Sequence, residues 1–225
     1  MPAPNGEATP AMRLQILSTE HWSLLASRSL AWNESFSRAG MFLTTLTGAI
    51  VALALVAQAS AFGDGFTLFA LVILPVVLLI GVATGIRLGT ANYHEALCVI
   101  GMNRIRAAYL ELAPDVERYF VMSAHDDPPG MRITMGVRPG GGMLFWFLQI
   151  LSGTGTVVMI LNAVLTGVIV ALVTLRIEGA ASAILGVGAL GFVVALLLQG
   201  LYVRRNIAKV QAGLRPLFPT PSADQ

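Results

Sequence analysis

Four long runs of apolar residues, each free of charged side chains, dominate the pattern along this chain of 225 residues. A helix needs about 20 apolar residues to cross the hydrocarbon core of a bilayer. Residues 40–61 and 66–86 satisfy this requirement and are separated by the short polar turn 62–65. Residues 180–203 form a further run of this kind. The pattern predicts that each of these runs is a transmembrane helix.

The remaining apolar run, residues 143–175, is too long for one span. Its 33 uncharged residues would form a helix about 50 Å long. We expect a break at residues 152–155, which read Ser-Gly-Thr-Gly. Residues 153–175 would then span the membrane, and the aromatic-rich residues 143–151 would form a helix at the membrane interface. A single steep helix starting near Phe147 is the alternative.

The composition supports a membrane protein. Hydrophobic residues make up 56% of the chain and charged residues 12%, whereas about 25% of the residues in a typical soluble domain are charged. The net charge of +2 is too small to suggest nucleic-acid binding. We therefore predict an all-α, polytopic membrane protein with four transmembrane helices in two hairpins and additional cytoplasmic amphipathic helices. Its expected partners include membrane lipids and no nucleic acid.

The basic residues are distributed unevenly between the two sides. Residues 1–39, 87–142 and 204–225 carry thirteen of the fourteen Lys and Arg residues, and the two connections on the other side carry only Arg176. Because basic residues favour the cytoplasmic side, we expect both termini and the middle segment to be cytoplasmic. No signal-peptide pattern precedes the first span. We expect a multi-pass protein of a bacterial cytoplasmic (plasma) membrane.

Residues 19–38 show a helical pattern before the first span. The apolar or small side chains on one face, which recur in steps of three and four, are Trp22, Leu25, Ser29, Trp32 and Phe36. We expect this helix to begin at Thr19 as its N-cap. The two tryptophans favour a helix that lies along the membrane surface. Packing of the same face on the middle segment is the alternative.

A second periodic stripe follows the second span. Its members, which we call the seam, are Cys98, Met102, Ile105, Tyr109, Leu112 and Val116. This spacing is typical of a coiled coil or helix bundle, and His94 continues it by one step. We expect the second span to continue into this helix without a break as far as Ala113, with Pro114 opening a further turn.

Residues 93–98, which read Tyr-His-Glu-Ala-Leu-Cys, resemble the start of a zinc-binding pattern. Zinc requires three or four ligands, and a second histidine is missing at the required spacing. We therefore expect Cys98 to occupy a packing position and Glu95 to be solvated. We predict no metal site and no cofactor.

Residues 124–142 are rich in Pro and Gly and predict a flexible linker. Within this stretch, His125, Asp126 and Asp127 are expected to be solvated, with weak divalent-cation binding as the alternative. In the C-terminal tail, the basic side chains that could contact anionic lipid headgroups are Arg204, Arg205 and Lys209.

The four predicted spans contain no Asp, Glu, His, Lys or Arg, the residues on which proton relays and many ion-coupled transporters depend. Asn162 and Thr166 are the deepest polar pair. We expect them to form interhelical hydrogen bonds, and the alternative is that they line a pore. Small residues at four-residue spacing in the last three spans indicate close helix packing, within one chain or between chains.

The chain contains no nucleophile elbow, Walker loop or dinucleotide-binding fingerprint, so we do not expect an enzyme. Residues 28–58 and 101–120 resemble small, uncharacterised bacterial integral membrane proteins. The order of amphipathic helix, two-span hairpin and cytoplasmic helix is also similar to SLATT domains, which implies a pore-forming membrane effector. The second hairpin departs from that two-span pattern.

The sequence thus predicts a non-enzymatic membrane protein that acts as a structural, scaffolding or sensing component. We expect it to form a homo-oligomer through the seam and the small-residue faces, with an unidentified protein partner as a further possibility. The alternative is an oligomeric pore or channel lined by Asn162 and Thr166.

Overall fold

The computed structural model describes residues 8–137, 143, 151, 153–177 and 180–221 and, for residues 209–213, the backbone alone. Helices make up most of this described part, which contains no strand. Four helices are long and apolar enough to cross a membrane. They are α1 (Pro10–Ser60), α2 (Asp64–Leu112), α5 (Thr154–Arg176) and α6 (Ala181–Gly213). This confirms the predicted all-α fold with four such helices.

Helix α1 begins earlier than the sequence pattern predicted. Pro10 occupies the first helical position, where its missing N–H breaks no hydrogen bond. The hydroxyl oxygen of Thr9 accepts a hydrogen bond from the Met12 N–H at 3.3 Å. Thr19 lies inside the helix and donates its hydroxyl to the Gln15 carbonyl at 2.9 Å. The prediction that Thr19 caps a separate helix is therefore wrong.

The predicted amphipathic helix and the first span form one continuous helix, because α1 remains helical to Ser60. Gly40 is the first residue of the predicted span and lies inside α1. A single glycine inside a helix costs only about 1 kcal/mol relative to alanine, which is too little to end the helix.

A tight turn connects α1 to α2. Ala61 and Phe62 have positive φ angles of 45° and 59°, and the Gly63 N–H donates to the Ser60 carbonyl at 2.8 Å. Asp64 then begins α2, where a carboxylate suits the positive end of the helix dipole.

Two short helices follow α2 along the chain. Helix η1 (Pro114–Tyr119) is a 3-10 turn opened by Pro114, as expected. Helix α3 (Pro128–Thr134) lies within the predicted linker. The predicted interfacial helix over residues 143–151 lies mostly outside the described residues. Helix α5 begins at Thr154 with Gly153 as its N-cap, so the third span has 23 residues.

The described chain divides into two compact units. The first, which we call the terminal unit, comprises residues 1–33, 91–142 and 210–225. The second, which we call the spanning unit, comprises residues 34–90 and 143–209.

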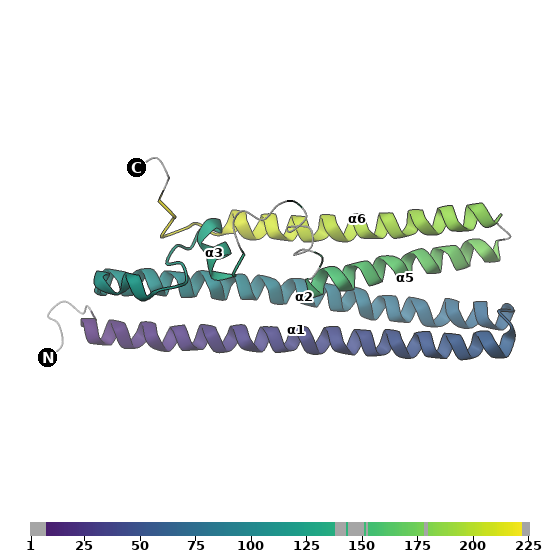
Figure 1. Ribbon diagram of the computed structural model, residues 1–225, viewed down its shortest axis with the longest axis horizontal. Helices are drawn as coiled ribbons and strands as arrows, with labels where there is room; N and C mark the ends of the chain where they lie inside the picture. Colours follow the sequence, from purple (N-terminus) through teal and green to yellow (C-terminus); the bar gives the residue numbers. More distant parts are fainter. Residues whose placement is uncertain (1–7, 138–142, 144–150, 152, 178–179, 222–225) are drawn as a thin grey trace. The chain divides into compact units, whose positions relative to one another are not determined.

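In the spanning unit, α1 lies beside α2 and α5 lies beside α6 (Figure 1). The buried apolar side chains that form the core are Phe42, Leu46, Ala49, Ala70, Leu74, Val77, Leu88, Val158 and Leu165. Close approach of α5 and α6 depends on small residues, since a Cβ at Gly167 would lie 2.9 Å from the Gly188 carbonyl oxygen. The small-residue row of the third span therefore packs within one chain here.

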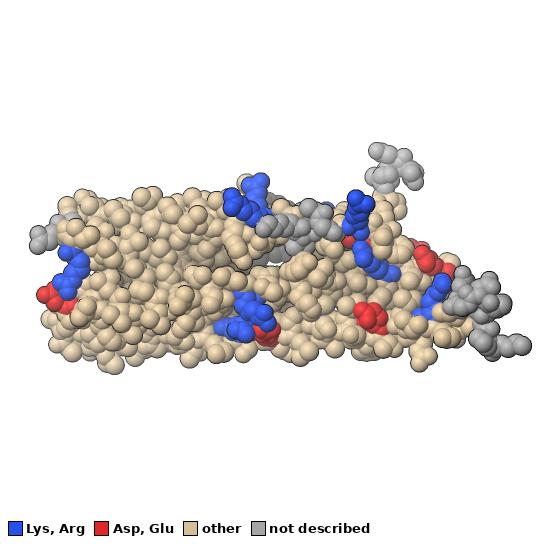
Figure 2. All heavy atoms as spheres, turned by 180° about the vertical axis from the view of Figure 1, so that it is seen from behind, with Lys and Arg blue, Asp and Glu red and all other residues tan. Residues whose placement is uncertain are grey.

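Charged residues mark both ends of the spanning unit. At one end Glu34 accepts hydrogen bonds from Arg38 and Arg87, each at 2.9 Å. At the other end Arg176 pairs with Asp64 at 2.8 Å. Arg87 follows Asp64 by 23 positions along α2, which corresponds to about 35 Å at 1.5 Å per residue. Figure 2 shows the surface over these helices free of charged side chains between two charged groups.

In the terminal unit, α1 packs on α2 with a face other than the tryptophan face that the sequence pattern indicated. Leu24 contacts the position of Gly101, where an added Cβ would lie 2.7 Å from a Leu24 methyl carbon. His21 lies beside Tyr109, with ring centroids 6.3 Å apart. By contrast, Trp22 is 68% exposed and Leu25 is 40% exposed. The alternative in which the tryptophan face packs on the middle segment is therefore wrong.

Candidate functional site

The seam is divided between buried and open positions. Cys98, Met102 and Ile105 are buried inside one copy of the terminal unit, at 2%, 2% and 5% exposure. Residues between them on other faces of α2, including Val99 and Asn103, are buried as well. This part of α2 is therefore surrounded within the protomer and is not open to a second copy.

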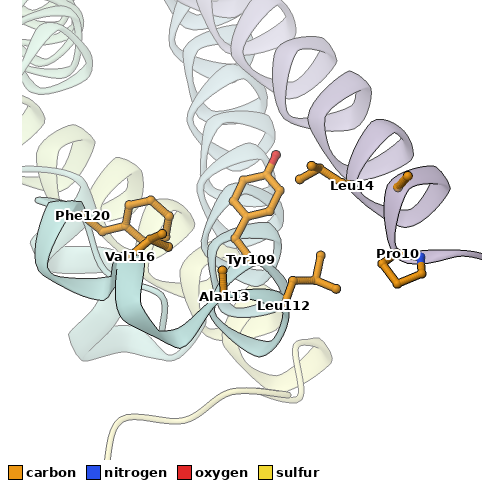
Figure 3. Close-up of a pocket in the computed structure, with 8 residues that line it drawn as sticks. Pro10, Leu14, Tyr109, Leu112, Ala113, Val116 and Phe120 are labelled. Carbon is orange, nitrogen blue, oxygen red and sulfur yellow. The ribbon is translucent and has the colours of Figure 1, made fainter.

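The remaining seam residues line an open apolar groove. Tyr109, Leu112 and Val116 lie on one wall, with Ala113 and Phe120, and the start of α1 forms the other wall through Pro10 and Leu14 (Figure 3). The groove has a volume of about 530 Å³, within the range of small-molecule sites. None of the described residues that line it is charged. The sequence pattern selected three of its residues but did not indicate the contribution of α1.

The Tyr-His-Glu-Ala-Leu-Cys stretch, residues 93–98, lies within α2. The Cys98 sulfur lies 3.9 Å from His94 Nδ1, and the part of the chain that the structure describes contains no group of three metal-ligating side chains. Glu95, predicted to be solvated, instead accepts hydrogen bonds from Arg28 at 2.9 and 3.1 Å. This ion pair joins α2 to α1 and leaves the Glu95 side chain 18% exposed, so the prediction for Glu95 is wrong.

A buried polar network surrounds Asn103, which is fully buried on α2. Its Nδ2 donates to the His125 carbonyl at 2.7 Å. Its Oδ1 accepts from Arg106 Nη1 at 2.7 Å and from the Thr134 hydroxyl at 2.8 Å. A buried amide is stable only when its hydrogen-bonding groups are satisfied. Asn103 therefore fixes α3 and the loop before it against α2.

The Pro and Gly residues that suggested a flexible linker instead stabilise the loop before α3 and the start of this helix. Asp127 is the N-cap of α3 and accepts a hydrogen bond from the Gly130 N–H at 3.0 Å. Pro128 follows at the first helical position, where proline is favoured. A Cβ at Gly130 would collide with the backbone of His125, so glycine is required there. The prediction that this stretch is a flexible linker is wrong for residues 124–137.

Asp126 and Asp127 bind the C-terminal segment of the chain. Asp126 accepts the Leu217 N–H at 2.9 Å and the Phe218 N–H at 2.8 Å, one on each carboxylate oxygen. Asp127 accepts the Thr220 N–H and the Thr220 hydroxyl, both at 2.8 Å. Both carboxylates are buried, with Asp126 at 4% and Asp127 at 9% exposure. The expectation that they are solvated is wrong.

Arg104 completes this arrangement, which we call the tail clasp. Its Nε donates to Asp126 Oδ2 at 2.7 Å, and its Nη2 donates to the Arg215 carbonyl at 3.1 Å. The Asp126 N–H in turn donates to the Phe218 carbonyl at 3.1 Å. The clasp therefore holds the tail through its backbone from Arg215 to Thr220. No sequence signal connected Asp126 to a segment some 90 residues away.

Both clasp carboxylates have pKa values below the ordinary value for aspartate. Burial alone would raise the pKa of Asp126, but hydrogen bonds from the Leu217 N–H, the Arg104 guanidinium and the Phe218 N–H outweigh burial and lower it. Burial also opposes the shift at Asp127, where hydrogen bonds from Thr220 and the Gly130 N–H lower the pKa. The clasp is therefore built around ionised carboxylates.

Asn162 lies in the core of the spanning unit and is 1% exposed. Its side chain lies against Gly81 on α2, where an added Cβ would collide with Oδ1. Neither Oδ1 nor Nδ2 has a hydrogen-bond partner among the described residues. The Thr166 hydroxyl donates within its own helix, to the Asn162 carbonyl at 2.8 Å. Asn162 is thus a buried helix-contact residue that lacks the expected interhelical hydrogen bond among the described residues.

Arg204 and Arg205 are exposed near the end of α6, next to the uncharged span. The side chain of Lys209 lies outside the described part of the chain. The positions of the two arginines are compatible with the predicted headgroup contacts, which no contact in the structure tests.

Comparisons of this chain with protein-family models, with curated proteins and with solved structures found no match. The resemblances drawn from residues 28–58 and 101–120 therefore stay expectations. The function has to be inferred from the ion pairs at the two ends of the spanning unit, the apolar groove and the tail clasp.

Proposed function

We propose that this protein is a non-enzymatic membrane component in which the spanning unit serves as an anchor and the terminal unit serves a structural, scaffolding or sensing role. The observation that carries the proposal is the placement of charge in the spanning unit. Its ion pairs lie at the two ends, Glu34 with Arg38 and Arg87 at one and Asp64 with Arg176 at the other. The four predicted spans contain no Asp, Glu, His, Lys or Arg.

This arrangement suits a passive anchor. Ionisable groups inside a bilayer are costly and are kept where transport or proton transfer uses them. The deepest polar side chain, Asn162, packs against Gly81. The unequal distribution of Lys and Arg supports an orientation with both termini and the terminal unit in the cytoplasm.

The polar chemistry of the chain is concentrated in the terminal unit. The Asn103 network and the tail clasp are both hydrogen-bonded groups that would position a cytoplasmic surface. Self-association remains part of the proposal, and the open half of the seam at Tyr109, Leu112 and Val116 is the region of the seam that can support it. Native mass spectrometry in lipid nanodiscs, with Leu112→Asp as the variant, tests this part.

Ion flux from proteoliposomes tests the anchor role against the pore. We expect the protein to leave the leak of K⁺ and Cl⁻ at the level of protein-free liposomes, with and without the Asn162→Leu substitution. A leak that appears with the wild-type protein and is abolished by Asn162→Leu would instead establish a pore with Asn162 on its pathway.

A further inference from the structure

The tail clasp uses every backbone N–H group between Pro216 and Thr220. Between Pro216 and Thr220, the two prolines have no N–H, and the remaining N–H groups belong to Leu217, Phe218 and Thr220. All three donate to Asp126 or Asp127, at 2.8 to 2.9 Å. A backbone N–H that is left unpaired near buried groups is unfavourable. The clasp offers no acceptor at positions 216 and 219, and proline at these positions has no N–H to leave unpaired.

The side chains of the segment contribute less to the contact than its backbone does. Leu217 is 63% exposed, and only Phe218 among the residues from Arg215 to Thr220 is half-buried. From the side chains of the segment, the Thr220 hydroxyl donates a hydrogen bond to Asp127 at 2.8 Å. Main-chain hydrogen bonds and charge-assisted contacts of this kind are used in the recognition of extended peptides.

The clasp residues themselves are held independently of the tail. Asp127 caps α3 through the Gly130 N–H, and the loop carrying Asp126 is tied to α2 by Asn103 through the His125 carbonyl. Arg104 lies on α2 and pairs with Asp126. These contacts link the loop to two helices, so the acceptors are positioned by residues outside the segment that they bind.

We propose that Arg104, Asp126 and Asp127 form a binding site for an extended peptide of the pattern Pro-x-x-Pro-Thr, and that residues 215–220 are its tethered ligand. An untethered peptide of this pattern, from a second copy of the chain in particular, then competes with the tail for the same acceptors. Tethering gives the tail an effective concentration on the order of 1 mM, so a free peptide competes only near that concentration. The site goes beyond the proposed anchor role and does not depend on it.

The test follows the tail in the full-length protein in lipid nanodiscs. Spin labels at Val121→Cys and Pro221→Cys, in a Cys98→Ala background, report the distance between the loop and the tail by double electron–electron resonance. Val121 is 88% exposed and Pro221 is exposed, so neither label enters the clasp. We expect one short distance in the protein alone. When the peptide of residues 214–221 is added at about the effective concentration of the tail, roughly half of this short distance should be replaced by a long, broad distribution.

A modified peptide and two protein variants separate the contribution of the backbone N–H groups from that of the side chains. The peptide with N-methyl groups on the residues equivalent to Leu217 and Phe218 keeps both side chains and should not displace the tail. In the protein, Leu217→Pro with Phe218→Pro should release the tail, whereas Leu217→Ala should leave it docked. The released variant should bind a fluorescently labelled peptide of residues 214–221 at least about tenfold more tightly than the wild type does, because the tail no longer competes. Adding Asp126→Asn should reverse that gain.

Two results would overturn the proposal. Displacement of the tail by the N-methylated peptide as readily as by the parent peptide would show that the backbone N–H groups do not direct binding. Failure of the peptide to bind after the tail has been released would show that the clasp is a fixed intramolecular contact. If the double proline variant does not fold, the competition experiment on the wild-type tail still decides between these outcomes.

Discussion

Gly81 is the position at which the packing of the spanning unit can be tested most sharply. A Cβ added there would collide with Asn162 Oδ1 and would lie 2.7 and 2.9 Å from two carbons of the Phe42 ring. Contacts this short force neighbouring groups to move. Asn162 and Phe42 are both buried, at 1% and 0% exposure, so neither side chain has open space to move into.

The expected loss of stability for Gly81→Ala follows from two opposing effects. Overpacking a buried contact costs about 1–3 kcal/mol, and alanine gains up to about 1 kcal/mol over glycine in helix propensity. With the full propensity gain, the net loss relative to the wild type is about 0–2 kcal/mol, and relative to a glycine-to-alanine control with the same gain it is about 1–3 kcal/mol. Gly89→Ala on the same helix is the matched control, because nothing lies within 4 Å of its added Cβ. The control should be neutral or slightly stabilising.

Combining Gly81→Ala with Asn162→Ala tests whether the collision with the Asn162 side chain causes the loss of stability. Removing the side chain of Asn162 relieves the collision with Oδ1 but leaves the contact with Phe42, so part of the loss should be recovered. The coupling energy in the double-mutant cycle should be about 1 kcal/mol or more. Unfolding by denaturing detergent in mixed micelles, followed by circular dichroism, measures each free energy. If Gly81→Ala is as stable as Gly89→Ala, or if the two substitutions are additive, the packing described for α2 and α5 is wrong.

Further predictions concern the terminal unit. Gly130→Ala should displace the loop before α3 and release the tail, because the added Cβ meets the His125 backbone; a preserved short Val121–Pro221 spin-label distance would contradict this. The pKa values of Asp126 and Asp127 are lowered from 3.8, so their stabilising contribution is complete above that value and is lost as the pH falls through the lowered values. The tail should therefore stay docked at about pH 6 and detach only in acid below about pH 4, and detachment near neutral pH would refute the assignment. Arg28→Gln and Glu95→Gln should show a coupling energy of about 0.5–1 kcal/mol, since the pair is partly exposed and screened by solvent; additive losses in a thermal unfolding cycle would show that the pair contributes nothing.

The spacing of apolar residues predicted the helices that are determined by their own local sequence. The apolar runs identified the four helices, since each run by itself satisfies the length that a bilayer requires. Cys98, Met102 and Ile105 are buried, but the seam spacing could not distinguish packing within one chain from packing between chains. The face of α1 that packs on α2 was missed because it carries His21 and Arg28 as well as Leu24, and their polarity hides the stripe.

The tail clasp could not be predicted, because it depends on contacts between distant segments. Pro and Gly between residues 128 and 136 suggested a linker, yet the same residues supply the first turn of α3 and the close approach at Gly130. The Asp127-Pro128 pair is an N-cap followed by a favoured first helical residue, and this local signal could have identified α3. No local signal pairs Asp126 with Leu217 and Phe218.

Accessibility of engineered cysteines tests most directly whether the spanning unit anchors the terminal unit at the cytoplasmic side. In a Cys98→Ala background, Phe62→Cys lies in the turn between α1 and α2 and is 73% exposed in the wild type, and Val121→Cys is 88% exposed. A membrane-impermeant maleimide added to intact cells should label Phe62→Cys at once and should label Val121→Cys only after the membrane has been permeabilised. Labelling of both sites in intact cells, or of Val121→Cys alone, would contradict the anchor and its orientation.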